Sequence, residues 1–347
     1  MTHYNKPAEL YDGLRLHQNE NTGGCSPRVL EALAKLRAEE IAVYPPYARA
    51  THACASYLGV DPSTVALVNG LDEGLTGLAV AYLRPPVGGP VPEAVIPEPA
   101  FEIFRIDTEV VGGRVVPVAP TPDFSLPLDD VLAAITPRTR VVFLTNPNNP
   151  TGVSMPLDAI RQVARRVPEG AVVLVDEAYA EFAGRTFLRD LPSFPNVLVG
   201  RTFSKAFGLA GIRIGCLVGA PHVLDPIRAV IPVYSVNIAA VVAVEAALSD
   251  LAFVEDYLRQ VTESKALLYG ACDRLGLTYW KSDTNFVLVS AGDRCGALVA
   301  GLAARGIYVR DRSTEAGCAG CFRVSTGIVE HTRRDIAAME DVLCAAR

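Results

Sequence analysis

The stretch TFSKAFGLAGIR, residues 202–213, decides the fold, and it lies between two short apolar runs. Val197–Val199 before it and Ile214–Val218 after it have the composition of buried strands. Lys205 therefore stands among small residues and phenylalanines instead of on a polar surface. Such surroundings favour the neutral form of an amine, which is the form that reacts with an aldehyde to give a Schiff base. The alternative interpretation is a glycine-rich loop with a solvated lysine.

The neighbours of Lys205 indicate which aldehyde it could meet. Thr202 and Ser204 offer hydroxyl groups, and Arg213 offers a guanidinium group that suits a phosphate. Pyridoxal phosphate (PLP) carries both an aldehyde and a phosphate. The stretch therefore favours a PLP site.

Length and composition bound the class of protein. The chain has 347 residues, 50% of them hydrophobic, so it can bury a large core and is expected to form more than one domain. A formal net charge of −6 argues against nucleic acid or an anionic membrane as partner. The eight cysteines are scattered singly and Met1–Gly13 is polar, which favours reduced thiols in the cytoplasm. Cys318 and Cys321 lack a second ligand pair, so we expect a turn there and no metal site.

One apolar run, Ala229–Leu248, is long enough to suggest a membrane span. Pro232, Asn237 and Glu245 interrupt it, so a loop followed by a buried helix is the better interpretation.

The first half of the chain alternates between helices and strands. Ser26 and Pro27 predict the start of a helix that continues to Glu40. Further helices are predicted at 48–58, from the glycine-containing step at 70–74 to residue 83, and at 102–110, 128–134 and 157–166. Strands are predicted at 65–68, 94–96, 115–118, 141–145, 171–175, 197–199 and 212–218. Apolar strands separated by helices predict a mostly parallel sheet covered on both faces, with ligands at the carboxyl ends of its strands. No G-x-G-x-x-G follows the first strand, which disfavours a nicotinamide-dependent dehydrogenase.

The pattern changes after two long helices, predicted at 237–249 and 253–275. Short strands follow at 285–289, 307–310 and 322–325, with helices at 294–305 and 329–346. We therefore expect a large domain at 45–250 and a smaller α+β domain formed by 251–347 together with the N-terminal arm, 1–44.

Several strand ends carry groups that suit the same cofactor. Asp176 follows a buried strand, and a carboxylate beside a pyridine nitrogen keeps that nitrogen protonated. Tyr179 could reach the ring oxygen, and an asparagine in the rigid loop 146–152, NPNNPTG, could donate a hydrogen bond to it. The glycine–helix step at 70–74, GLDEG, offers backbone N–H groups to a phosphate. Helix capping by Asp176 and ordinary packing of Tyr179 are the alternatives.

Three motifs in this order, NPNNPTG (146–152), VDEAY (175–179) and SKAFGLAGIR (204–213), resemble those of the fold-type I PLP-dependent aminotransferases, and more narrowly the histidinol-phosphate aminotransferase family. The likeness extends to 19–21, 44–45, 70–73, 309–311 and 321–324.

The resemblance implies a role for each matching residue. Lys205 would hold the cofactor covalently and then move a proton between the substrate α-carbon and the cofactor, while Asp176 would pair with the pyridine nitrogen. Asn149 and Tyr179 would contact the ring oxygen, and Phe101 would stack on the ring. The phosphate would be bound by Thr202, Ser204, Arg213 and the backbone of Leu71 and Asp72. Tyr44 would reach that phosphate from the other subunit of a homodimer.

The resemblance also implies the substrates. Arg323 would bind the α-carboxylate of glutamate and, with Arg310 and Asn21, the phosphate of histidinol phosphate. Arg323 points opposite to Phe322 and Val324 on a short strand, toward a side that a cleft could occupy; Arg310 could instead be a solvated surface arginine. The implied reaction is transamination between histidinol phosphate and 2-oxoglutarate in histidine biosynthesis, by a ping-pong cycle through pyridoxamine phosphate.

Some positions depart from the family pattern. Phe101 stands where tyrosine is common, Leu71 replaces a smaller residue, and Thr22–Cys25 replaces a turn that usually contains proline. The first departure leaves the chemistry unchanged, whereas the last two lie near the cofactor phosphate and the substrate entrance and leave the substrate open. The rivals are an aromatic amino-acid aminotransferase, a phosphothreonine-type decarboxylase that breaks a different α-bond, and a ligand-sensing domain that kept the pocket.

Overall fold

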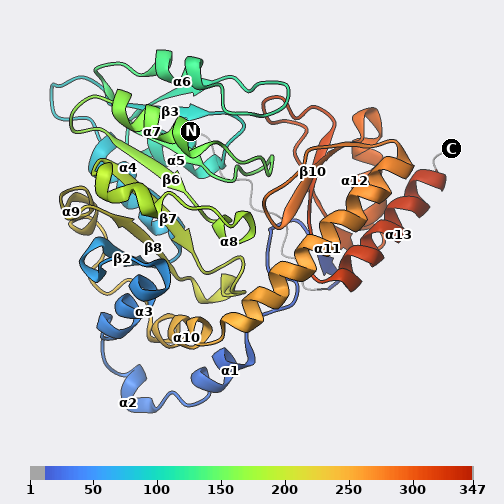
Figure 1. The fold of residues 1–347 in the computed structure, drawn as a ribbon, viewed down its shortest axis with the longest axis horizontal. Helices are drawn as coiled ribbons and strands as arrows, with labels where there is room; N and C mark the ends of the chain where they lie inside the picture. Colours follow the sequence, from blue (N-terminus) through green and yellow to red (C-terminus); the bar gives the residue numbers. More distant parts are fainter. Residues whose placement is uncertain (1–11, 346–347) are drawn as a thin grey trace.

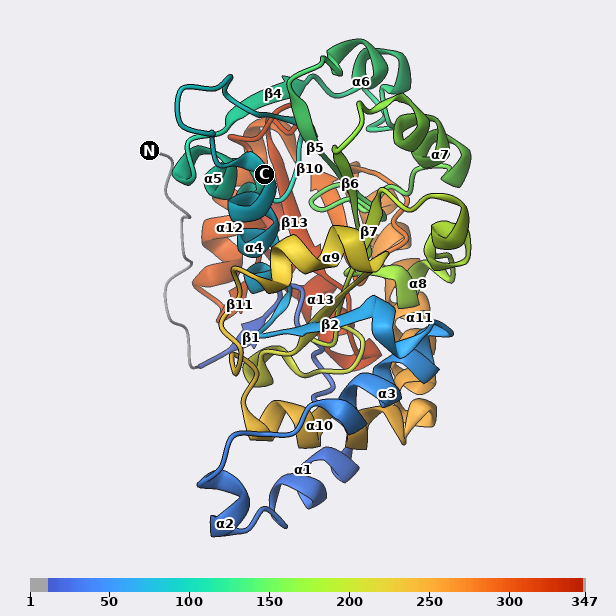
Figure 2. The same cartoon turned by 90° about the vertical axis from the view of Figure 1, so that its left-hand side faces the viewer.

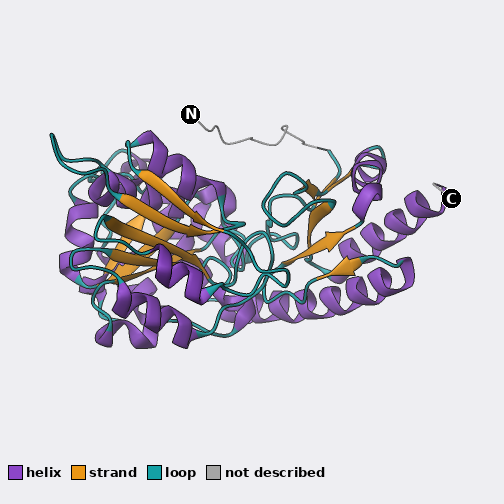
Figure 3. Cartoon of the chain, turned by 90° about the horizontal axis from the view of Figure 1, so that it is seen from above, coloured by secondary structure: helices purple, strands orange, loops and turns teal. Residues whose placement is uncertain are grey.

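The structure is a computed structural model that describes residues 12–345, and it forms two lobes (Figure 1). The large lobe contains a seven-stranded sheet, and the small lobe contains a four-stranded sheet. Helix α11 (Leu251–Leu275) leads from beneath the large lobe into the small one, and Figure 3 shows the same two lobes from above.

The strands of the large sheet lie in the order β2-β8-β7-β6-β5-β3-β4. Strand β8 is antiparallel to both of its neighbours, and the other neighbouring pairs are parallel. Figure 2 shows the neighbouring strands β5, β6 and β7 side by side. The bounds are β2 (Val65–Val68), β3 (Glu93–Pro97), β4 (Arg114–Val118), β5 (Thr139–Thr145), β6 (Val172–Asp176), β7 (Val197–Thr202) and β8 (Gly215–Gly219). The expected mostly parallel sheet is confirmed.

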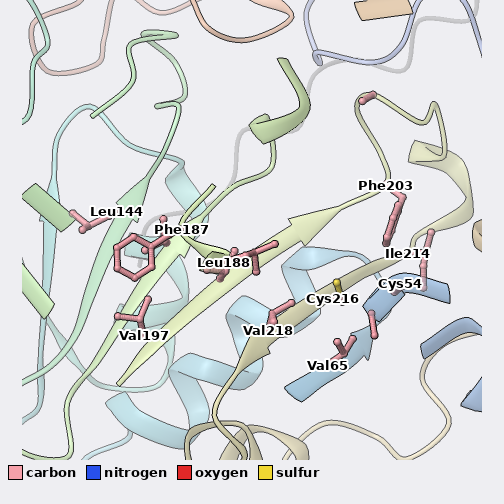
Figure 4. Packing of buried hydrophobic residues seen from close by; sticks show 14 of the residues in the cluster. Cys54, Val65, Leu144, Phe187, Leu188, Val197, Phe203, Ile214, Cys216 and Val218 are labelled. Atoms are coloured by element: carbon pink, nitrogen blue, oxygen red, sulfur yellow. The ribbon is translucent and has the colours of Figure 1, made fainter. Parts of the chain in front are cut away.

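Helices cover both faces of this sheet because its inner strands are apolar on both sides. Along β6, Val172 and Leu174 belong to one hydrophobic cluster, and Val173 and Val175 belong to the other. The first cluster packs under α4 (Leu71–Leu83), α5 (Glu102–Val110) and α9 (Pro221–Arg228). The second, part of which Figure 4 shows, packs under α3 (Ala48–Leu58), α6 (Leu128–Ala134), α7 (Leu157–Arg166) and α10 (Ile238–Leu248). A short helix, α8 (Ala180–Ala183), follows β6.

The small lobe is an antiparallel sheet with helices on it, as expected for an α+β unit. Its strand order is β12-β13-β10-β9, with bounds β9 (Thr278–Tyr279), β10 (Phe286–Ser290), β12 (Arg310–Asp311) and β13 (Cys321–Ser325). Its other helices are α12 (Cys295–Ala303) and α13 (Val329–Ala345). The N-terminal segment joins this lobe, because β1 (Leu14–Arg15) pairs in parallel with β11 (Ile307–Tyr308).

Three predicted elements are wrong in detail. The strand expected at 307–310 is two strands, β11 paired with β1 and β12 paired with β13. The helix expected at 27–40 is two helices, α1 (Pro27–Leu33) and α2 (Ala38–Ile41). They are separate because residues 34–35 form a turn and the backbone of Arg37 is extended. The Glu40 carboxylate accepts the Arg37 N–H at 3.1 Å and so starts a new helix. The strand expected at 212–218 begins only at Gly215, since Ala210–Ile212 is a 3₁₀ turn.

The N-terminal segment contacts both lobes. Strand β1 belongs to the small lobe, whereas α1 packs against α10 of the large lobe. The boundaries at 45 and 250 therefore stay a prediction. Within 12–345 no helix combines the length and apolarity that crossing a bilayer requires. The run at 229–248 forms turns and then α10, where the Asn237 side chain caps the helix by accepting the Ala240 N–H at 2.8 Å.

Candidate active site

A cavity of about 350 Å³ lies where the carboxyl ends of the large sheet face the small lobe. The large lobe contributes one side, which we call the floor: Asp72, Asn149, Asp176, Thr202, Ser204, Lys205 and Arg213. The opposite side, which we call the wall, consists of residues 17–20 with Arg310, Arg312 and Arg323. Most of the predicted site residues are thus brought together from strands that are distant in sequence.

The centre of the floor pairs an acid with an amine. Asp176 ends β6 and is only 4% exposed, and its carboxylate accepts the Ala178 N–H at 3.0 Å. Burial raises the pKa of Asp176 to about 7. Lys205 lies beyond the end of β7, with its Nζ 5.9 Å from the centre of the Tyr179 ring and donating to the Gln18 carbonyl at 3.0 Å. A buried acid with one backbone donor is a site in which a cation would be stabilised.

One corner of the floor is built for an anion. Helix α4 begins there after Gly70, whose φ is +73°, and Arg213 lies against it. A Cβ at residue 70 would stand 2.2 Å from an Arg213 guanidinium nitrogen, so only glycine allows this approach. Arg213 donates to Asp72 at 2.9 Å. Helix N–H groups, this guanidinium and the hydroxyls of Thr202 and Ser204 form a donor set that suits a phosphate.

The residues around the corner explain why Leu71 is tolerated where a smaller residue is common. Its side chain packs on Gly200 of β7, where an added Cβ would lie 3.0 Å from Leu71. Gly200 therefore compensates for the larger side chain at residue 71.

The edge of the cavity holds the groups predicted to contact a ring. The Asn149 side-chain oxygen accepts a hydrogen bond from Arg323, which leaves its NH₂ as the donor. The Tyr179 hydroxyl accepts from the Asn19 amide at 2.9 Å. The rigid loop is held by Asn148, which donates to the Pro99 carbonyl at 3.0 Å. Phe101, at the start of α5, lines the cavity beside these groups.

The wall is rich in guanidinium groups. Arg323, on β13, is 4% exposed and donates to the His17 carbonyl at 2.9 Å, and burial lowers its pKa to about 9. Arg310 stands opposite Arg323 in the β12–β13 ladder, 3.9 Å from the Glu102 carboxylate. An arginine deep in this position keeps its charge and can bind a carboxylate or phosphate through two N–H groups.

The sequence predicts no role for five of the polar residues that line the cavity: His17, Gln18, Asn19, Glu20 and Arg312. Burial, and then the positive charges nearby, lower the pKa of His17 to about 4, so it is neutral at physiological pH. Asn19 has a φ of +57°, and its carbonyl accepts from the Asn285 amide at 3.0 Å. Alternation along a strand could have identified Arg312, because it puts residues 310 and 312 on one face.

Two predicted site residues do not line the cavity. Tyr44 is 75% exposed, and its ring stacks on Tyr234 with 4.3 Å between the centroids. Asn21 donates to the Ala206 carbonyl at 3.0 Å and accepts the Gly23 N–H at 2.8 Å. It lines a neighbouring hollow instead, so a direct contact with substrate phosphate does not follow from its position.

Comparison with known proteins identifies the family. Residues 11–338 match the model of the family described as aminotransferase class I and II. The chain belongs to this family. Among its relatives are a histidinol-phosphate aminotransferase of Symbiobacterium thermophilum, 37% identical over 96% of this chain and 91% of that protein, and one of Moorella thermoacetica, 34% identical over 96% and 86%.

A solved structure supports the same assignment. The histidinol-phosphate aminotransferase of Sinorhizobium meliloti, crystallised with pyridoxal-5′-phosphate, superposes with a TM-score of 0.87 at 28% identity over 97% of this chain and 92% of that one. The expected aminotransferase fold and the PLP cofactor are thereby confirmed. The floor of this aminotransferase has a chemical group for each part of the cofactor: an amine for the aldehyde, a carboxylate for the ring nitrogen and an anion corner for the phosphate.

Proposed function

We propose that this aminotransferase exchanges an amino group between histidinol phosphate and 2-oxoglutarate, with glutamate and imidazole-acetol phosphate on the other side. The observation that carries the proposal is the wall, where three arginine side chains line one cavity opposite the Lys205 amine. Relatives 34–37% identical over 96% of the chain bear the name of this activity. A wall of this kind suits a substrate that carries negative charge and also extends to the floor.

The floor would hold the cofactor in one orientation. Arg213, Thr202, Ser204 and the N–H groups at the start of α4 would bind its phosphate. Asp176 would stabilise a protonated ring nitrogen, and that positive charge would in turn favour the carboxylate form of the buried acid. When bound, PLP supplies an electron sink for the bond that breaks at the substrate α-carbon and carries the amino group between the two half-reactions.

Lys205 would both hold the cofactor and act on the substrate. Its Nζ already donates to the Gln18 carbonyl, which aims the amine into the cavity between the floor and the wall. In its free form this amine would move a proton between the substrate α-carbon and the cofactor. Tyr179 and Asn149 would orient the ring through its oxygen.

The wall would fix the rest of the substrate. Arg323 has two N–H groups committed to His17 and Asn149, which set the plane of its guanidinium group. In this plane it would bind the α-carboxylate of glutamate or oxygens of the phosphate group of histidinol phosphate. Alternate binding of these two anions in one place suits a ping-pong cycle.

We further propose a cytoplasmic homodimer with the domain division expected above. Tyr44 and Tyr234 form an exposed stacked pair, and Val43 and Val233 beside them are exposed as well. A second subunit would cover this apolar surface and bring Tyr44 to the phosphate of the neighbouring cofactor. Sedimentation of the holoenzyme tests this, and a monomer at catalytic concentrations would contradict it.

The function is tested by comparing kcat/KM for histidinol phosphate and phenylalanine, with Arg310→Ala alongside. We expect the wild-type enzyme to prefer histidinol phosphate, and Arg310→Ala to lose more on this substrate than on phenylalanine. Equal kcat/KM values would favour an aromatic aminotransferase. Adding glutamate alone should change the absorbance of the bound cofactor and release 2-oxoglutarate, whereas a decarboxylase or a sensor would release none.

A further inference from the structure

Arg312 is a cavity-lining residue with unused donor capacity. It is 8% exposed, and its terminal nitrogen donates to Glu102 at 3.2 Å and to Glu315. Its Nε is buried and has no hydrogen-bond partner among residues 12–345. A buried donor left without an acceptor is costly, and native structures rarely keep one without a reason.

Glu102 connects the two lobes at this point. It lies in the first turn of α5 in the large lobe, next to Phe101, and its carboxylate faces Arg312 at 3.2 Å and Arg310 at 3.9 Å in the small lobe. Glu315, the other partner of Arg312, is largely buried, and burial raises its pKa. One partly exposed carboxylate therefore faces two guanidinium groups at the edge of the cavity.

Two arginines on the wall favour an additional anion. Arg312 is paired with Glu102 and Glu315, whereas Arg323 forms no ion pair with a carboxylate among residues 12–345. The Nε of Arg323, like that of Arg312, is buried without a hydrogen-bond partner among the described residues. A ligand with several oxygens could accept from both arginines at once, and a phosphate dianion offers three oxygens where a carboxylate offers two.

We propose that Arg312 is a specificity-determining residue that binds the phosphate of the substrate, and that Glu102 holds its guanidinium group until that phosphate displaces the carboxylate. This inference rests on the proposed function. Arg323 alone suffices for an α-carboxylate, whereas the extra charge and third oxygen of a phosphate require a further donor. Arg312 supplies that donor, which explains how one wall accepts both anions.

The test compares histidinol phosphate with histidinol, which differ only in the phosphate group. We expect Arg312→Gln to lower the ratio of their kcat/KM values by about 10- to 100-fold, the worth of one charge-assisted hydrogen-bonded contact. Arg274→Gln is the matched control, because Arg274 pairs with Glu340 on the exposed surface of the small lobe. A ratio that Arg312→Gln leaves unchanged, while Arg310→Gln lowers it, would overturn the inference.

A second measurement does not depend on the Arg312 variant folding or on turnover. Inorganic phosphate, titrated into the holoenzyme and followed by the absorbance of the bound cofactor, should bind at least about threefold more tightly to Glu102→Gln than to wild type, since its competitor for Arg312 is gone. Unchanged phosphate affinity in Glu102→Gln would contradict the role of Glu102. A wild-type enzyme with no preference for histidinol phosphate over histidinol would instead overturn the proposed function.

Discussion

The floor and the wall of the cavity are built in different ways. Floor residues follow the ends of neighbouring strands in one sheet, so the register of β5, β6 and β7 fixes their spacing. Wall residues come from β12 and the residue that follows it, from β13 and from the segment at 17–20, which the β1–β11 pairing and the Asn285–Asn19 hydrogen bond hold beside the small sheet. The floor is suited to one cofactor, whereas on the wall the Nε groups of Arg312 and Arg323 are buried without a hydrogen-bond partner among residues 12–345. We infer that the floor defines the chemistry and the wall defines the substrate.

The largest effect is expected on the floor, from Lys205→Ala. Removing the amine removes both the covalent attachment and the proton transfer, so kcat should fall by at least about 10³-fold. Cofactor should still bind, because the anion corner is intact. Stopped-flow absorbance with glutamate measures this loss.

The chain contains its own control for that experiment. Lys265 lies in the same tripeptide, Ser-Lys-Ala, but on α11, where its Nζ donates to the Ser282 carbonyl at 2.7 Å. Lys265→Ala should therefore keep turnover. A similar loss in both variants would mean that Lys205 has no special role.

The second effect is expected from Asp176→Asn. An amide cannot stabilise a protonated ring nitrogen, so kcat should fall by about 10²- to 10³-fold for every substrate alike. Glutamate and histidinol phosphate half-reactions, measured separately, check this uniformity. A loss confined to one substrate would place Asp176 in substrate selection and break the division between floor and wall.

The third effect is expected on the wall, from Arg323→Gln. Loss of a buried charge that holds an anion should weaken binding of the transition state by about 2–4 kcal/mol, which corresponds to roughly a 30- to 800-fold fall in kcat/KM. Cofactor affinity should fall much less than kcat/KM, because Arg323 contacts the floor only through its hydrogen bond to Asn149 among the described residues. Titration of apoenzyme with PLP provides the control, and a loss of cofactor affinity as large as the loss of kcat/KM would contradict this assignment.

The anion corner predicts a smaller effect for Gly70→Ala. The new Cβ would collide with Arg213 and the positive φ would strain the backbone by about 1–3 kcal/mol, so the Kd for PLP should rise about 5- to 150-fold. Gly184→Ala is the matched control, because Gly184 has a φ of +63° but nothing within 4 Å of an added Cβ. Equal PLP affinities in the two variants would show that the approach of Arg213 is unimportant.

The smallest effect concerns the small lobe that supports the wall. Asp335, on α13, is buried, one of its oxygens has no hydrogen-bond partner among the described residues, and burial raises its pKa to about 7. At pH values between the ordinary pKa near 4 and this raised pKa, Asp335 holds a proton in the folded chain that it has lost in the unfolded chain. Stability should therefore fall as pH rises from about 4 to 7, by up to about 1.4 kcal/mol per pH unit from this group.

Asp335→Asn should remove that part of the pH dependence, as urea denaturation at pH 5 and pH 7 would show. Asp293→Asn, at an exposed position, serves as the control. A wild-type slope that persists in Asp335→Asn would assign the pH dependence to another buried acid, of which Asp176 is the first candidate.

The contrast also explains what the sequence could predict. Asp176, Lys205 and Arg213 lie in contiguous motifs at strand ends, where local spacing already implies proximity. His17 was missed because its position depends on pairing between the two ends of the chain, and Arg312 was missed because it lies just beyond the strand expected at 307–310.

The single helix expected at 27–40 failed for a local reason. Its apolar pattern continues through residues 34–37, but Glu40 caps the extended Arg37 and begins a second helix. A side-chain capping contact of this kind competes with continuation of the helix, and the periodicity of apolar residues does not reveal it.

The most direct test of the central claim asks which lysine holds the cofactor. The holoenzyme would be reduced with borohydride, digested, and searched by peptide mass spectrometry for a phosphopyridoxyl group. We predict the group on the Lys205 peptide and nowhere else. Modification of another lysine, such as Lys265, or a bound cofactor that leaves Lys205 unmodified after reduction, would contradict the role assigned to Lys205.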